Sequence, residues 1–243
     1  MMKLLVKVIN KALSPFNARI VSVDNKKPKD FNDVFDVNKP KNQIVHLNKL
    51  SALSDNIRGM INHRAGEELF SLAYMQSLSG DVVEVGSFQG KSTFFLGHAV
   101  EQSKNGKMYA VDHFRGNIGK EHFYKVEKGD LSDLELGFRR NIKNAGLSEV
   151  VTLINKPNHE AVADIADGTV RFLYIDGDHT AKGVQRDLDL FTSKLKAGAI
   201  IAFDDYDNVN FGGLVRVVNE FISKSKCKRK YLIDRTLIVE LGG

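Results

Sequence analysis

Two apolar runs of the sequence each end in clustered acidic residues. The polar residues that follow residues 172–175 and 199–203 are Asp176, Asp178, His179, Asp204 and Asp205. Apolar runs of this length are typical of buried parallel strands. Neighbouring strands lie about 4.8 Å apart, so Asp176, Asp204 and Asp205 would meet at one edge of a sheet. Three carboxylates this close need a divalent cation or an added proton, and we expect the cation.

The same acids also have a structural interpretation. Asp204 and Asp205 would then cap the loop after their strand, and Asp178 would cap a helix that begins near Ala181. The paired placement of the carboxylates favours the metal site.

A strand, a glycine turn and a helix start follow one another at residues 82–93. Gly86 and Gly90 allow backbone conformations or close approaches that a side chain would block. A helix that begins near Lys91 offers free amide groups to an anion. The sequence therefore predicts a site for a ligand carboxylate or phosphate at this turn.

An acid and a polar loop follow the next two strands. Asp112 ends the run at residues 108–111, where open α/β sheets place an acid that binds two ribose hydroxyls. The loop at residues 155–159 would flank an adenine. The glycines match neither the G-x-G-x-x-G of dinucleotide-binding proteins nor the G-x-x-x-x-G-K-[ST] of a P-loop. We therefore expect a ligand that contains adenosine.

Strand-like and helix-like runs alternate along most of the chain. The strand-like runs are residues 82–85, 108–111, 150–154, 170–175 and 199–203, and the helix-like runs are residues 90–103, 131–145, 159–166, 181–195 and 212–223. This alternation predicts a parallel sheet with right-handed crossovers. Residues 230–241 predict an antiparallel hairpin with a turn at Asp234 and Arg235. We expect an α/β fold: a Rossmann-like, seven-stranded, mostly parallel sheet with a C-terminal antiparallel hairpin and helices on both faces.

The first 48 residues form an N-terminal extension in this interpretation. Residues 1–13 place apolar and basic side chains on opposite helical faces, which predicts an amphipathic helix. Such a helix packs on the body or on a second protomer, or lies on a membrane surface, and we favour packing. Residues 14–48 predict a loose connector. Residues 50–78 predict one or two helices at the start of the main domain, residues 49–243.

The composition narrows the location and the partners. The 243 residues suit one large domain with an extension. Cys227 is the single cysteine and no signal peptide is in view, so we expect a cytoplasmic protein. No stretch reaches the roughly 20 apolar residues that cross a bilayer. The net charge of +5 includes basic runs without interleaved aromatic residues, so we expect a solvated surface rather than nucleic-acid binding.

The residues from Glu84 to Ser92, Asp112 and the segment from Ile175 to Thr180 together resemble class I S-adenosylmethionine-dependent methyltransferases. The resemblance is strongest to the metal-dependent branch that includes antibiotic-sugar O-methyltransferases and the cephamycin-pathway methylase. It covers about residues 55–241. It implies that Glu84, Gly86 and Gly90 line the methionine end of the cofactor and that Asp112 holds its ribose. The other residues expected to bind the cofactor are Ser87, Ser92, Asn158 and Asp176.

The resemblance also implies a magnesium site and a general base. Asp176, Asp204 and Asp205 match the metal ligands of the sugar-methylating relatives, and Asp178 matches their base. Catechol O-methyltransferases carry a basic residue three positions after the first ligand, where this chain has His179. The base is therefore either Asp178 or His179.

This residue set suits methyl transfer to oxygen. An alcohol is a poor nucleophile until it loses a proton, and Mg²⁺ on the acceptor oxygen lowers the pKa of that oxygen. Three protein acids leave room on the ion for two vicinal oxygens. We expect an O-methyltransferase that acts on a hydroxyl of a sugar or a sugar-containing small molecule. The alternatives are a catechol or phenol methylase, a NAD-dependent dehydrogenase and a non-catalytic protein that binds S-adenosylmethionine.

Residues 113–130 would form a lid, an acceptor wall or a surface loop.

Overall fold

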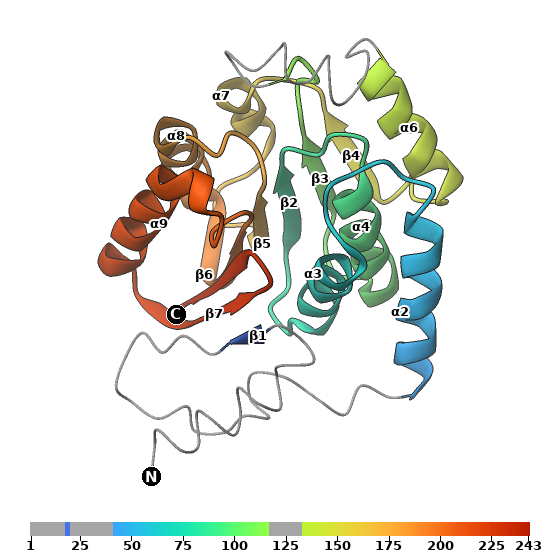
Figure 1. Cartoon of the computed structure of the whole chain (residues 1–243), viewed down its shortest axis with the longest axis horizontal. Coiled ribbons are helices and arrows are strands. Elements are labelled where there is room, and N and C mark those ends of the chain that lie inside the picture. Colours follow the sequence, from blue (N-terminus) through green and yellow to red (C-terminus); the bar gives the residue numbers. More distant parts are fainter. Residues whose placement is uncertain (1–17, 20–40, 117–132) are drawn as a thin grey trace.

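A mixed β-sheet runs through the centre of the protein (Figure 1). Its strand order is β1-β7-β8-β6-β5-β2-β3-β4. Strands β2 to β6 are parallel, whereas β8 pairs antiparallel with β6, β7 with β8, and β1 with β7. The strands are β1 (Ala18–Arg19), β2 (Asp81–Val85), β3 (Met108–Val111), β4 (Val151–Ile154), β5 (Val170–Ile175), β6 (Leu195–Phe203), β7 (Cys227–Ile233) and β8 (Thr236–Leu241). The seven predicted strands are confirmed, and the two-residue β1 adds an eighth that the sequence analysis did not predict.

The computed structural model describes residues 18–19, 41–116 and 133–243. The predicted helix at residues 1–13 lies outside this part, as do most of the predicted connector and residues 117–130 of the predicted lid segment. The domain boundary near residue 48 falls inside helix α2 (Lys41–Ser54) and stays a prediction. None of the described helices is long and apolar enough to cross a membrane.

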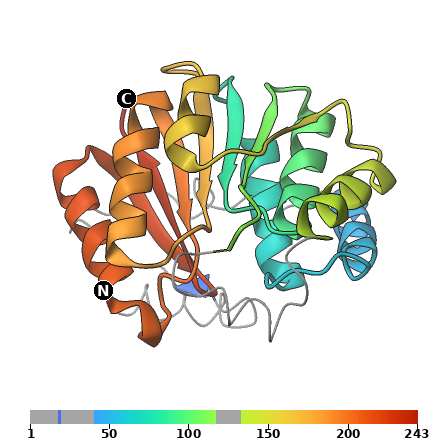
Figure 2. The ribbon, with the colours of Figure 1, turned by 90° about the horizontal axis from the view of Figure 1, so that it is seen from above.

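Helices cover both faces of the sheet, as Figure 2 shows from above. Neighbouring residues of one strand face opposite sides: Phe172 packs into the hydrophobic cluster that contains residues of α3 and α4, and Leu173 packs into the cluster that contains residues of α8 and α9. The remaining helices have the bounds α3 (His63–Met75), α4 (Lys91–Ser103), α6 (Leu134–Asn144), α7 (Asn158–Ala161), α8 (Ala181–Phe191) and α9 (Gly212–Lys224). The prediction of helices on both faces is therefore confirmed.

Some elements have different bounds from those predicted. The helix expected at residues 159–166 is one turn, α7, followed by a 3-10 turn that ends where Ile165 becomes extended. Strand β6 begins at Leu195 rather than residue 199, because Leu195 pairs with Val170 across an irregular register. Strand β7 begins at Cys227 rather than residue 230 and so takes in part of the basic run, whose Lys224, Lys226 and Lys228 are exposed as expected. Lys228 and Arg229 pair with Glu240 at 2.7 Å. These ion pairs allow a charged segment to extend the hairpin.

The order of the strands creates a crevice at one end of the sheet. The chain runs from β2 outward through β3 to β4, then returns to place β5 on the other side of β2. Ligands of open α/β sheets bind at such a reversal, outside the carboxyl ends of the strands. Gly86 and Asp176 directly follow β2 and β5, so this topology brings their loops together.

The opposite end of the sheet is held together by one buried cation. Arg171 of β5 is fully buried and donates to the backbone oxygens of Gly80 (2.9 Å), Ala73 (2.6 Å) and Asn105 (3.1 Å). Burial lowers the pKa of Arg171 to about 10, which leaves it charged at neutral pH. A single guanidinium thus ties together α3, the turn before β2 and the turn before β3.

We predict that Arg171→Met lowers the free energy of unfolding by about 3 kcal/mol or more. The apolar side chain fits the space but leaves buried carbonyl groups without donors, each at a cost of about 1–3 kcal/mol. Urea denaturation followed by circular dichroism measures the change. Lys196→Met is the control, because Lys196 donates to the oxygen of Ser79 through a solvent-exposed hydrogen bond at the same end of the sheet (2.6 Å). Equal stability of the two variants would contradict the role of Arg171.

Candidate active site

Gly86 lets the ends of β2 and β5 approach each other. Its φ of 90° lies in the left-handed region, and a Cβ at this position would collide with the backbone oxygen of Asp176. Gly90 (φ 87°) ends the turn and precedes the first residue of α4. The predicted glycine turn is therefore present, and its close approach to β5 explains why residue 86 has no side chain.

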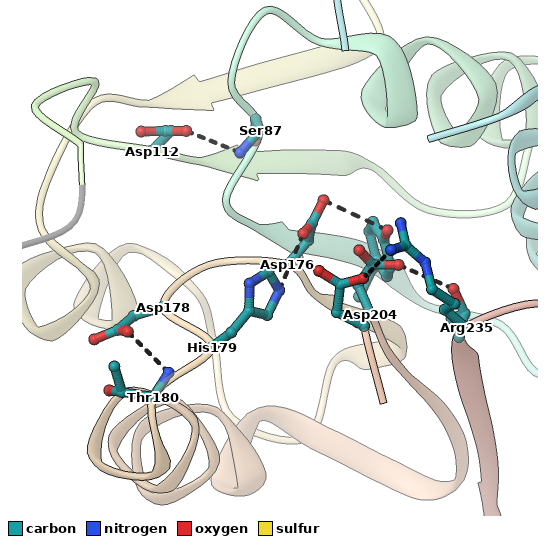
Figure 3. Close-up of polar contacts among 11 residues, drawn as sticks. Ser87, Asp112, Asp176, Asp178, His179, Thr180, Asp204 and Arg235 are labelled. Carbon is teal, nitrogen blue, oxygen red and sulfur yellow. Dashed lines mark hydrogen bonds and ion pairs between the residues drawn. The ribbon is translucent and has the colours of Figure 1, made fainter. Parts of the chain in front are cut away.

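Asp112 organises the loops after β2 and β3. Its Oδ2 accepts hydrogen bonds from the backbone N–H groups of Ser87 (2.9 Å) and Phe88 (2.8 Å), and its Oδ1 accepts one from Phe114 N–H (2.7 Å). Figure 3 shows the contact with Ser87. Phe88 and Phe114 both have positive φ, at 47° and 56°. Asp112 thus holds two strained turns on either side of the same cavity.

Glu84 lies fully buried within β2. The hydroxyl of Thr93, in the first turn of α4, donates to its Oε2. Burial raises the pKa of Glu84 to about 7, although neighbouring hydroxyl groups lower it. Its Oε1 and the nearby Ser87 Oγ are buried without a hydrogen-bond partner among the described residues. Polar atoms in this state are rare in folded proteins and suit a ligand that brings its own donors.

The carboxyl ends of β5 and β6 bring two acids and a histidine together. Asp176, His179 and Asp204 each offer one ligand atom, and these atoms lie within 4.8 Å of one another. His179 Nε2 is 3.4 Å from Asp176 Oδ1, and both side chains are mostly buried. Thr236 of β8 donates to Asp204 Oδ1 (3.0 Å), and the Tyr174 hydroxyl lies 3.5 Å from Asp176 Oδ2. Adjacent strands thus place Asp176 and Asp204 side by side, as their spacing in the sequence predicts.

The electrostatics of this cluster follow from its burial. Burial, followed by the charge of Asp204, raises the pKa of Asp176 well above its usual value. Burial and the charge of Asp205 likewise raise the pKa of Asp204. Burial lowers the pKa of His179, but its contacts with the surrounding carboxylates outweigh this effect and the pKa is raised overall. The cluster therefore holds more carboxyl groups than its single histidine can balance, and these groups resist ionisation together unless a further cation binds.

Asp205, the third predicted metal ligand, is not in this group of three. It has a φ of 53°, and its Oδ1 lies 3.2 Å from Arg235 Nη1 in the turn between β7 and β8. Figure 3 shows Arg235 beside the acidic cluster. The position of this guanidinium was not recognised from the sequence, because pairing in the sheet, rather than proximity in the chain, brings the hairpin turn to β6.

The two candidate bases have different surroundings. His179 points toward Asp176 and Asp204 (Figure 3). Its ring lies 4.9 Å from the ring of Phe211. Asp178 turns away and accepts a hydrogen bond from Thr180 N–H, the residue before α8 (3.0 Å). The alternative that Asp178 caps this helix is wrong, because Thr180 is the N-cap and its hydroxyl oxygen accepts from Gly183 N–H (3.1 Å). His179 adjoins the acids, whereas Asp178 does not.

One cavity of about 590 Å³ contacts most of the predicted residues. Its lining includes Gly86, Ser87, Ser92, Asp112, Asn158, Asp176, Asp178, His179 and Asp205. Glu84, Gly90 and Asp204 lie just outside the lining. The volume is in the range of small-molecule and cofactor sites.

Several residues of the cavity wall were not predicted. Gly59, Met60 and Ile61, between α2 and α3, close one side, and Asn208 and Phe211, after β6, close another. Arg186 of α8 also reaches the cavity. The sequence gives no periodic or motif signal for the loop residues, because only tertiary packing brings them to the crevice. His113, Phe114 and Arg115 of the predicted lid segment do line the cavity, as an acceptor wall would.

Comparison with known proteins gives one family match and several structural matches. Residues 83–206, about half of the chain, match the model of a family described as a methyltransferase domain. The matched region runs from β2 to the residues after β6 and so contains the glycine turn, Asp112 and the acidic cluster.

Solved structures with similar folds include three O-methyltransferases. The O-methyltransferase NovP matches with a TM-score of 0.66 at 17% identity, over 83% of this chain and 100% of that one. The O-methyltransferase from Bacillus cereus, in complex with SAH, matches with a TM-score of 0.56 at 18% identity, over 87% and 96%. TomG from Streptomyces achromogenes, in complex with SAM and involved in tomaymycin synthesis, matches with a TM-score of 0.57 at 13% identity, over 81% and 89%. These likenesses show a shared fold.

The family match spans the glycine turn, the acid after β3 and the acids after β5 and β6, and the O-methyltransferase structures share the fold of this chain. The chain therefore belongs to this methyltransferase family and is an S-adenosylmethionine-dependent methyltransferase of class I.

Proposed function

We propose that the protein transfers a methyl group to a hydroxyl of a sugar or sugar-containing small molecule, with the help of a divalent cation. The observation that carries this proposal is the convergence of Asp176, His179 and Asp204 within 4.8 Å at the end of two adjacent strands. Asp176 and His179 also line the cavity that contains the glycine turn and Asp112. A methyl donor and a cation at these places would be neighbours.

The residues around the glycine turn fit S-adenosylmethionine. Glu84 Oε1 is a buried acceptor without a partner among the described residues, and the amino group of the methionine end supplies a donor for it. The buried hydroxyl of Ser87 beside it can accept or donate a further hydrogen bond. Free amide groups at the start of α4 suit its carboxylate. Asp112 lies at the end of β3, where it would accept hydrogen bonds from the ribose hydroxyls. When bound, the cofactor supplies an activated methyl group on a sulfonium.

The acidic cluster fits a divalent cation. Asp176 and Asp204 are mostly buried and lie side by side. The guanidinium of Arg235 pairs with Asp205 rather than lying between these two aspartates. Carboxylate oxygens are the ligands that Mg²⁺ prefers. A cation bound there supplies Lewis acidity that lowers the pKa of a hydroxyl group. We propose Asp176 and Asp204 as its principal ligands, with Asp205 as the third oxygen ligand.

His179 is the better placed of the two candidate bases. Its Nε2 lies 3.4 Å from Asp176 Oδ1, without a hydrogen-bond partner among the described residues, and the ring of Phe211 lies against the imidazole. A carboxylate that orients an imidazole is a recurrent arrangement in general base catalysis. Asp178, held by the backbone of Thr180, is the alternative base.

The cavity wall beside the cluster supports a polar acceptor. Asp178, Arg186 and Asn208 supply both hydrogen-bond donors and acceptors, as recognition of several sugar hydroxyls requires. The matched structures include proteins titled O-methyltransferases, which supports oxygen as the acceptor atom. Phe211 and Phe114 also line the cavity, and this favours a catechol or phenol as the second candidate.

A cytoplasmic location, and contact of residues 1–13 with a second protomer or a membrane, remain proposals.

We predict metal-dependent methylation of glycosides that carry vicinal hydroxyls. The assay measures transfer of label from S-adenosylmethionine to a panel of nucleoside-diphosphate sugars, antibiotic glycosides and catechols. Excess EDTA should lower turnover at least about a hundredfold, and Mg²⁺ or Mn²⁺ should restore it, because the hydroxyl loses its polarising charge. Equal turnover with and without chelator would contradict the metal role, and labelling of catechols alone would favour the second candidate.

We predict that Asp204→Ala mainly weakens metal binding, whereas Asp112→Ala mainly weakens cofactor binding. Asp204→Ala removes a metal ligand, so Mn²⁺ affinity should fall at least about tenfold while affinity for S-adenosylhomocysteine stays within about threefold. Asp112→Ala removes the acceptor of three backbone N–H groups and a ribose partner, so affinity for S-adenosylhomocysteine should fall at least about tenfold.

Calorimetry measures S-adenosylhomocysteine binding, and the electron paramagnetic resonance signal of free Mn²⁺ measures metal binding. Asp167→Ala is the control, because exposed Asp167 pairs with Lys194 before β5, at the far end of the sheet. The same defect in both site variants would mean that the two subsites are not separate.

We predict that His179→Gln and Asp178→Asn differ in turnover. If His179 is the base, His179→Gln should lower kcat at least about a hundredfold, whereas Asp178→Asn should lower it less than tenfold. Both variants should keep Mn²⁺ affinity within about threefold. The opposite order of kcat values would assign the base to Asp178, and loss of Mn²⁺ binding by His179→Gln would make the histidine a ligand.

A further inference from the structure

A buried carboxylate lies beneath the cavity, outside the acidic cluster. Asp187 of α8 is fully buried, and its Oδ2 has no hydrogen-bond partner among the described residues. Its Oδ1 accepts a hydrogen bond from Asn158 Nδ2 (2.7 Å). Burial raises the pKa of Asp187 to about 6, so the group is ionised at pH 8. A buried charge is costly, and Asp187 belongs to neither the glycine turn nor the acidic cluster.

This contact fixes which way the amide of Asn158 points. An ionised carboxylate only accepts hydrogen bonds, so the amide must turn its nitrogen toward Asp187. Asn158 lines the cavity, and no donor among the described residues reaches its Oδ1. Nδ2 keeps one further N–H group, but Oδ1 is the one acceptor of the amide, and the contact with Asp187 holds it on the side away from that carboxylate. Asn158 would therefore present a hydrogen-bond acceptor to the cavity.

The order of the strands shows which part of an adenosyl ligand meets Asn158. The sheet runs β5-β2-β3-β4, with the glycine turn after β2, Asp112 after β3 and Asn158 at the start of α7 after β4. A sulfonium near β2 and a ribose on Asp112 leave the base on the β4 side, about one strand spacing further on. Adenine carries an exocyclic amino group, which is a donor, whereas hypoxanthine carries a carbonyl oxygen at the same place.

We propose that Asp187 is a positioning residue that holds Asn158 Oδ1 toward the adenine amino group, so that the pair selects adenine over hypoxanthine in the cofactor. This inference rests on the proposed place of the cofactor in the cavity. Arg186 also approaches Asp187, but its Nε is 3.7 Å from Oδ1 and its side chain is half exposed. The hydrogen bond from Asn158 is thus the strongest contact that Asp187 makes.

The test compares two cofactor products that differ at this one group. Calorimetry at pH 8 measures the affinity of the full chain for S-adenosylhomocysteine and for S-inosylhomocysteine. The wild type should prefer the adenine compound at least about tenfold, because the wrong base places two acceptors face to face. Asp187→Asn should reduce the preference to about threefold or less, since an amide at residue 187 accepts or donates and lets Asn158 turn.

Asp189→Asn is the matched control. Asp189 lies on the same helix, is exposed and accepts a hydrogen bond from Gln185 (2.8 Å), so this variant should keep the wild-type preference. If Asp187→Asn does not fold, Asn158→Ala replaces it and should show the same loss of preference. Melting temperatures, measured by circular dichroism, report the structural effect of each substitution separately.

Each outcome decides between the two proposals. A wild type that binds both compounds equally, or an Asp187→Asn variant that loses affinity for both by the same factor, overturns the positioning role and leaves the proposed function intact. Retention of the preference by Asn158→Ala also overturns it. A wild type that does not bind S-adenosylhomocysteine contradicts the proposed cofactor site itself.

Discussion

The structure depends on a concentration of negative charge where β2, β5 and β6 end. Glu84 lies in β2, and Asp176 and Asp204 directly follow the neighbouring strands β5 and β6. Each of the three has a pKa raised first of all by burial. Like charges in a shared site of low polarity repel each other and resist ionisation. A sequence that served stability alone would place apolar residues here. The arrangement becomes favourable when cationic or donor ligands arrive, and this requirement constrains every loop around the cavity.

The backbone at this end of the sheet is also held in unfavourable conformations. Gly86 allows the turn after β2 to touch the backbone of Asp176, and Asp112 holds Phe88 and Phe114 at positive φ. Such conformations cost about 1–3 kcal/mol each and persist only where the surroundings enforce them. The hydrogen bonds to Asp112 provide that enforcement. The strain lies beside the cavity, where it preorganises backbone amides for a ligand.

The fold and the acids could be predicted because strand periodicity is a local property. An apolar run followed by Asp176 or by Asp204 indicates the carboxyl end of a parallel strand, and such ends share one edge of a sheet. Which side chain joins Asp176 and Asp204 in the compact group could not be predicted from the sequence. His179 rather than Asp205 completes the compact group because Arg235 arrives from the distant hairpin turn and pairs with Asp205. Side-chain rotamers and contacts between distant segments have no signal in a single sequence.

Asp187 is an exception, since a signal for it was present. On α8 it occupies the same face as Val184, Leu188 and Phe191, all of which are buried. An acid on the apolar face of an amphipathic helix must find a partner or a function, because burial of an unpaired carboxylate is costly. The helical spacing alone is therefore a signal from which Asp187 could have been predicted, although it was not, and its partner Asn158 lies 29 positions away.

The two ends of the sheet show how a structural and a functional buried charge can be distinguished. Arg171 is fully buried, and its Nε, Nη1 and Nη2 each donate to a fixed backbone oxygen. The hydrogen bonds of Arg171 therefore already contribute to the stability of the folded chain. At the other end, Glu84 Oε1 and Asp187 Oδ2 are equally buried but have no partner among the described residues. Folding alone does not compensate their desolvation, so their interaction energy is left for a ligand or for the groups that hold one. This difference in hydrogen bonding, rather than burial or charge, assigns the function of the protein to the carboxyl end of its sheet.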